Sequence, residues 1–178
     1  MAWEEQVFEL LEDLEQQAEA LYDAERGPEL ADRVRAEYAA VTLASRLAAS
    51  VGGPVELDVQ GVGRLAGQLD RVAAGWVSLE VAGTEWVVRT AAVVEVRRAS
   101  ERALPEVAWS PLGRLGVGSA LRRLADAGEP CWWHRLDGGR VEGVPVRVGA
   151  DFVELRTGRE GRTVLVALDA LAAVARVG

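Results

Sequence analysis

Cys131 and His134 are the residues of this chain whose types could bind a metal ion or form a nucleophilic pair. A structural zinc site needs about four ligands, usually Cys or His, and the sequence contains one Cys and one His. A Ser-His-Asp arrangement would depend on the same lone His134. The sequence therefore predicts no metal site, no cofactor and no enzymatic activity.

The charge of the chain bears on its binding partners. All 20 basic residues are Arg, and Lys, Ile and Asn do not occur, a bias typical of a GC-rich, for example actinobacterial, genome. The formal net charge is -8, which repels phosphate polyanions at long range. RNA is therefore a disfavoured partner, although a local basic patch could still bind it.

The sequence contains an internal repeat. An offset of 76 residues aligns Gly61–Leu79 with Asp137–Leu155, with eight identical positions, and it places Trp76 over Phe152. A repeat of this length indicates two copies of one supersecondary unit. We call these units the first and the second repeat.

The pair Trp132-Trp133 is the most distinctive aromatic feature. Neighbouring residues of a strand point to opposite faces, and the repeat aligns Trp133 with the apolar position Leu57. If Trp133 points inward, Trp132 and His134 point outward and become candidate partner-binding residues. The alternative is that Trp132 packs under the linker or against the first repeat.

The elements that position these residues follow from apolar periodicity and turn signals. Helical spacing predicts helices over 2–25 and 28–51, joined at Gly27-Pro28 into a hairpin. Short alternating segments predict five strands over 55–96, and then a helix capped by Ser119 and five more strands over 131–174. The predicted divisions are a helical hairpin over 1–53, a first barrel over 54–98, a linker over 99–114, and a helix with a second barrel over 115–178.

The second repeat resembles Hfq and other Sm-like proteins. Pro130, Asp137-Gly138 and Gly143 have the spacing of that family through its first two strands, and the first repeat keeps Pro54, Gly61 and Gly67 in step. The resemblance covers about residues 38–98 and 115–178. It implies an α+β chain in which a helical hairpin precedes two repeated five-stranded small barrels, Sm-like or SH3-like, each preceded by a helix.

The same resemblance implies where RNA would bind. Sm-like proteins hold uridine-rich RNA with a polar residue in strand three and a basic pair in the turn between strands four and five. The second repeat has Ala167-Leu168 in that turn, whereas the first repeat keeps Arg89. If the chain binds RNA, Arg89, Arg97 and Arg98 are the expected contacts.

These observations favour a non-catalytic module that binds another protein or associates with itself. The alternatives are an RNA-binding Sm-like regulator and a transcription-associated factor. The single Cys, the acidic N-terminal residues and the lack of an apolar run of about 18 residues predict a cytoplasmic protein that does not enter a membrane.

Overall fold

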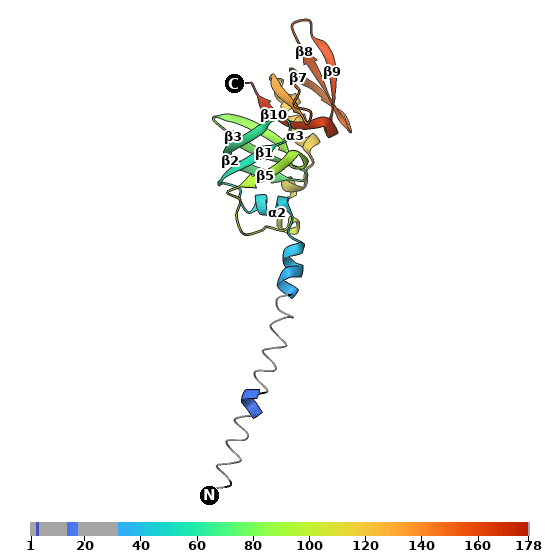
Figure 1. Cartoon of the computed structure of the whole chain (residues 1–178). Coiled ribbons are helices and arrows are strands. Elements are labelled where there is room, and N and C mark those ends of the chain that lie inside the picture. Colours follow the sequence, from blue (N-terminus) through green and yellow to red (C-terminus); the bar gives the residue numbers. More distant parts are fainter. Residues whose placement is uncertain (1–2, 4–13, 18–31, 178) are drawn as a thin grey trace. The chain divides into compact units, whose positions relative to one another are not determined.

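The computed structural model describes residue 3, residues 14–17 and residues 32–177 (Figure 1). The chain divides into two compact units, residues 1–41 and 42–178. In the first unit, residue 3, residues 14–17 and residues 32–39 are helical, and the predicted turn at Gly27-Pro28 lies outside the described residues. No helix in these described ranges combines the length and the apolar character needed to cross a bilayer.

The second unit begins with the short helix α2 (Leu43–Ala48). Its N-cap is Thr42, whose Oγ1 accepts a hydrogen bond from the Ser45 amide, while Ser45 Oγ accepts one from the Thr42 amide, both at 3.1 Å. This reciprocal capping box starts a new helix at Thr42. The prediction of one continuous helix over 28–51 is therefore wrong, because the described helix of residues 32–39 ends before this cap.

The first repeat folds into five strands with a short 3-10 helix, η1 (Thr90–Ala92), before the last of them. Alternating burial along β1 and glycine turns between the strands match the sequence pattern. The strands are β1 (Pro54–Val59), β2 (Gly63–Ala73), β3 (Trp76–Val81), β4 (Thr84–Arg89) and β5 (Val93–Arg97).

The second repeat begins with helix α3 (Val117–Ala127). Its N-cap is Gly116 rather than the predicted Ser119, and it ends at Gly128, which adopts φ +67° and donates its amide to Leu124 and Ala125. A 3-10 helix, η4 (Leu168–Ala170), precedes the last strand. The strands are β6 (Cys131–Arg135), β7 (Arg140–Val148), β8 (Phe152–Thr157), β9 (Arg162–Ala167) and β10 (Leu171–Arg176).

The prediction of two separate five-stranded barrels is wrong. The ten strands form one antiparallel sheet in the order β5-β1-β2-β3-β4-β10-β6-β7-β8-β9. The repeats meet where β10 pairs with β4, with Val174 opposite Val87, and β10 also pairs with β6 on its other side. The last strand of the second repeat is therefore hydrogen-bonded along both edges, so the two repeats share backbone hydrogen bonds instead of forming independent barrels.

Each half of the sheet contains its own hydrophobic core. Leu57 and Leu79 lie in the core of the first half, whereas Leu155 and the fully buried Trp133 lie in that of the second. The Trp133 indole N–H donates to the Gly143 carbonyl at 3.1 Å. One large side chain of the second core is therefore bonded directly to the backbone of β7.

The linker packs against the first half of the sheet. It contains the 3-10 helices η2 (Glu106–Ala108) and η3 (Pro111–Arg114). Trp109 joins the first core, and its indole N–H donates to the Leu104 carbonyl at 3.0 Å. Val107, two residues before Trp109, is 82% exposed, so only part of the apolar content of the linker is used for packing.

Candidate interaction surface

Four side chains form an aromatic patch on one face of the sheet, across β4, β6 and β7. The patch consists of Trp86, Trp132, His134 and Arg140. The rings of Trp86 and His134 have centroids 5.2 Å apart, and the Arg140 guanidinium lies 4.6 Å from the centre of the Trp132 ring. The three aromatic residues are half-buried and in contact with their neighbours, so Trp132 is already covered on one side by a cation–π contact.

His134 has a lowered pKa in this patch. Burial disfavours its charged form most, and the positive charge of Arg140 adds to this effect. Because the pKa of His134 in the folded chain lies below its ordinary value, neutral His134 contributes fully to the free energy of unfolding above the unfolded-state pKa. That contribution is lost as the pH falls through the folded-state pKa. The neutral imidazole is therefore the native form at neutral pH.

We expect Arg140→Gln to raise the pKa of His134 toward 6.5 without restoring it fully, because burial remains. The chain contains one His, so a single imidazole resonance in an NMR titration reports this pKa directly. The matched control is Arg147→Gln, which removes a charge that pairs with Glu154 and should leave the His134 titration unchanged. An unchanged curve in Arg140→Gln would contradict the assignment.

Cys131 lies on the opposite face of β6 from His134. An odd spacing along a strand places the two side chains on opposite faces, so they cannot act as a pair. Burial raises the pKa of the Cys131 thiol to about 11, and the nearby Arg176 opposes this only in part. The thiol therefore stays protonated at neutral pH and is a poor nucleophile.

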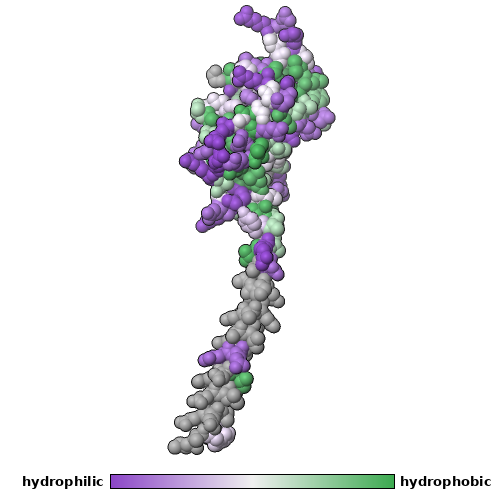
Figure 2. Space-filling model, viewed as in Figure 1, coloured by the Kyte–Doolittle hydropathy of each residue, from purple (hydrophilic) through white to green (hydrophobic). Residues whose placement is uncertain are grey.

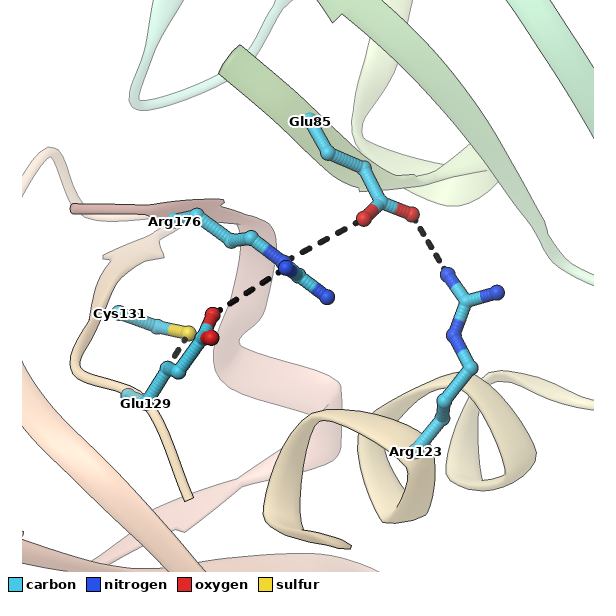
Figure 3. A network of polar contacts seen from close by, with 5 residues as sticks. All are labelled: Glu85, Arg123, Glu129, Cys131 and Arg176. Carbon is cyan, nitrogen blue, oxygen red and sulfur yellow. Dashed lines mark hydrogen bonds and ion pairs between the residues drawn. The ribbon is translucent and has the colours of Figure 1, made fainter. Parts of the chain in front are cut away.

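A polar network crosses the join between the two halves of the sheet (Figure 3). Glu85 of β4 accepts a hydrogen bond from Arg123 of α3 at 2.6 Å and lies 3.4 Å from Arg176 Nε of β10. Arg176 also pairs with Glu129 at 3.1 Å. These side chains are partly exposed, so each ion pair adds little free energy, but together they connect β4, α3 and β10.

Arg89, an expected RNA contact, lies at the same join. Its guanidinium donates to the Leu168 carbonyl and lies 3.4 Å from the Asp169 carboxylate, both of the second repeat. The Arg89 side chain is 21% exposed. Its described contacts therefore connect the repeats.

Arg97 and Arg98, the other expected RNA contacts, lie at the end of β5. Arg97 pairs with Glu95 at 2.7 Å, and Arg98 pairs with Glu56 at 3.4 Å. Each cation thus has an acidic neighbour, which lowers the positive potential that a phosphate would meet. Among the described residues, no ion pair joins either of them to Arg89, which pairs with Asp169 instead.

The two outer strands of the sheet are β5 and β9; in Figure 1, β9 lies near the top of the second unit and β5 lies lower down, next to β1. Each pairs with a neighbour on one side only. Each also carries a large apolar side chain in solvent: Val94 of β5 is 71% exposed, and Leu165 of β9 is 61% exposed. Figure 2 shows apolar and polar residues intermixed over the face in view, without one dominant apolar area.

Sequence reasoning found Trp132 and His134 but missed the residues around them. Trp86 and Arg140 lie beside these two residues because of strand pairings that no local sequence motif predicts. Sequence reasoning also missed Leu165 of the second repeat, although an alignment of the two repeats would have compared it with its equivalent in the first repeat. Among the described residues, no group of three or more His, Cys, Asp or Glu side chains is placed to hold a metal ion.

No protein-family model and no curated protein matches the chain.

Proposed function

We propose that the chain is a non-catalytic protein-interaction module that binds through the open edges of its sheet. The observation that carries the proposal is that β5 and β9 end the described sheet, each with one edge not paired to a described strand, and each carries an exposed large apolar side chain, Val94 and Leu165. An unpaired strand offers a row of backbone N–H and C=O groups to another strand, and natural proteins usually protect such edges.

The chemistry of the reactive side chains supports the non-catalytic part of the proposal. The buried Cys131 thiol has a raised pKa, and His134 lies on the other face of the same strand. A catalytic dyad needs a nucleophile and a base within hydrogen-bond reach. Neither residue offers that arrangement to the other.

A comparison of edge variants in the source cells tests this function. Tagged wild-type chain should recover bound protein, either untagged chain or another protein, that a Val94→Lys/Leu165→Lys variant loses, because two charges now occupy the edges. Val107→Lys is the control, since Val107 is more exposed than either edge residue but lies in the linker. Recovery of no bound protein, or equal recovery with both variants, would overturn the proposal.

We expect no saturable binding of mixed-sequence RNA, because Arg97 and Arg98 pair with acidic residues and the net charge is -8. Fluorescence anisotropy at low and then physiological salt measures this, since phosphate contacts weaken steeply with salt. Binding that disappears in the Arg97→Glu/Arg98→Glu variant would contradict the expectation and favour an RNA-binding regulator.

A further inference from the structure

A depression opens on the face of the sheet that carries the aromatic patch. It has a volume of about 540 Å³ and lies over β7, next to the turn from β8 to β9. The side chains that line it are those of Pro130, Glu142, Val144, Arg156 and Arg159. Alternation along β7 places Glu142 and Val144 on the same face as Arg140, so the depression adjoins the cation–π contact of the patch.

Arg156 and Arg159 are exposed arginines of the second repeat that line this depression together. Neither forms an ion pair, a side-chain hydrogen bond or a ring contact with a described residue. The other arginines of that repeat each make at least one such contact: Arg122, Arg123, Arg135, Arg140, Arg147, Arg162 and Arg176. Two positive charges that the described residues do not neutralise therefore lie at one place.

The turn that carries Arg159 is closed by its own hydrogen bonds. Thr157 Oγ1 donates to the Arg162 carbonyl at 3.2 Å. The Gly161 amide donates to the Gly158 carbonyl, also at 3.2 Å. A defined turn of the backbone therefore holds Arg159 at the border of the depression.

The first repeat lacks this charge arrangement. Glu80 lies opposite Gln68 in the register in which Arg156 lies opposite Val144, so an acidic residue takes the place of Arg156. The turn between β3 and β4, residues 82–83, contains no arginine. Because the first repeat forms the same strands without these cations, the fold does not require them.

We infer that this depression binds an acidic peptide segment of a partner protein. An Asp or Glu side chain of the peptide pairs with the guanidinium groups of Arg156 and Arg159, whose planar sets of donors match a carboxylate. A neighbouring apolar side chain of the peptide covers Val144. The depression lies on a face of the sheet, so the inference goes beyond the edge contact of the proposed function.

The signs of the lining charges favour a peptide over RNA. Glu142 lines the same depression, is exposed and forms no ion pair with a described residue. Its carboxylate repels the next phosphate of a nucleic acid chain, but it accepts a hydrogen bond from a peptide N–H. The net charge of -8 also repels a polyanion at long range, whereas a single carboxylate is attracted by the two nearby arginines.

A displayed library of short random peptides, selected on the purified full-length chain, tests the inference. We expect the selected sequences to combine Asp or Glu with a large apolar residue close by. Selection on an Arg156→Glu/Arg159→Glu variant should not enrich these sequences. The matched control is Arg97→Glu/Arg98→Glu, which changes the net charge by the same amount at the end of β5 and should select the same peptides as wild type.

Fluorescence anisotropy of a labelled peptide from this selection measures the size of the effect. Arg156→Gln and Arg159→Gln should each weaken binding by roughly tenfold, the usual effect of losing a hydrogen bond between charged groups. A peptide with Lys in place of its acidic residues should bind Arg156→Glu/Arg159→Glu more tightly than it binds wild type. This exchange of charges requires a folded site, so it separates direct pairing from misfolding of the variant.

Enrichment of no sequence by the wild-type chain, or of the same sequences by Arg156→Glu/Arg159→Glu, would overturn the inference. Saturable binding of mixed-sequence RNA that is lost in Arg156→Glu/Arg159→Glu but kept in Arg97→Glu/Arg98→Glu would also overturn it, because the two arginines would then bind phosphate. The Val94→Lys/Leu165→Lys variant tests the edge contact separately, so the failure of one proposal is distinguishable from the failure of the other.

Discussion

Trp133→Ala should destabilise the second half of the sheet by about 3–5 kcal/mol, the usual cost of removing a buried Trp. The Trp133 side chain is fully buried among residues of α3 and of the second-repeat strands. Its indole N–H satisfies the Gly143 carbonyl, which would lose this partner in the variant. The chemical midpoint of unfolding by urea, followed by far-ultraviolet circular dichroism, measures the loss.

Trp132→Ala is the matched control, because it removes the same side chain one position away. Trp132 is half-buried on the outer face, where its described ring contact is the Arg140 guanidinium. An exposed cation–π contact contributes only about 0.5–1 kcal/mol. Equal losses in the two variants would contradict the inward and outward assignment of this pair.

The repeat and most strand positions were predictable from the sequence, because glycine turns and alternating apolar residues are local signals. The five strands predicted over 55–96 correspond to β1–β5, and the five predicted over 131–174 correspond to β6–β10. The turn between β8 and β9, residues 158–161, is two residues longer than its equivalent between β3 and β4, residues 82–83. Such features depend on residues that are close together in the chain, and hydrophobic periodicity detects them well.

The join between the repeats was not predicted, because pairing of β4 with β10 depends on residues far apart in sequence. One signal was present. The stretch 171–175 is apolar throughout and fully buried, whereas the equivalent stretch of β5 contains Glu95 and Arg97. An unbroken apolar strand is typical of one covered on both faces, so the difference between the repeats marked the strand that lies inside the sheet.

The candidate site was predictable only in part for the same reason. Alternation along β6 was enough to separate Trp132 and His134 from their inward neighbours. The expectation that Arg89 meets RNA came from its place in the first repeat alone. In the folded chain its guanidinium contacts Leu168 and Asp169, which the sequence places 79 and 80 residues away.

Gly61→Ala should strongly destabilise the join between the two halves. Gly61 adopts φ +75°, which is unfavourable for a residue with a Cβ, and a Cβ there would overlap the carbonyl oxygen of Arg135 from the other half. Beside this contact, the side-chain amide of Gln60 donates a hydrogen bond to the Leu136 carbonyl at 3.5 Å. Because the overlapped oxygen belongs to the backbone, no side-chain rotation relieves the clash, and the turn or the end of β6 must move.

Gly63→Ala separates this clash from backbone strain. Gly63 also has a positive φ, +95°, but a Cβ there meets no atom within 4 Å. The control should therefore lose only the roughly 1–3 kcal/mol of an unfavourable backbone conformation, and Gly61→Ala should lose more. Thermal unfolding of both variants gives the two losses, and hydrogen exchange at the β4 and β10 amides locates them. We expect faster hydrogen exchange at those amides in Gly61→Ala alone, because the overlap holds the two halves apart. Equal exchange rates and equal losses of stability in the two variants would mean that the turn accommodates the added methyl group without disturbing the join.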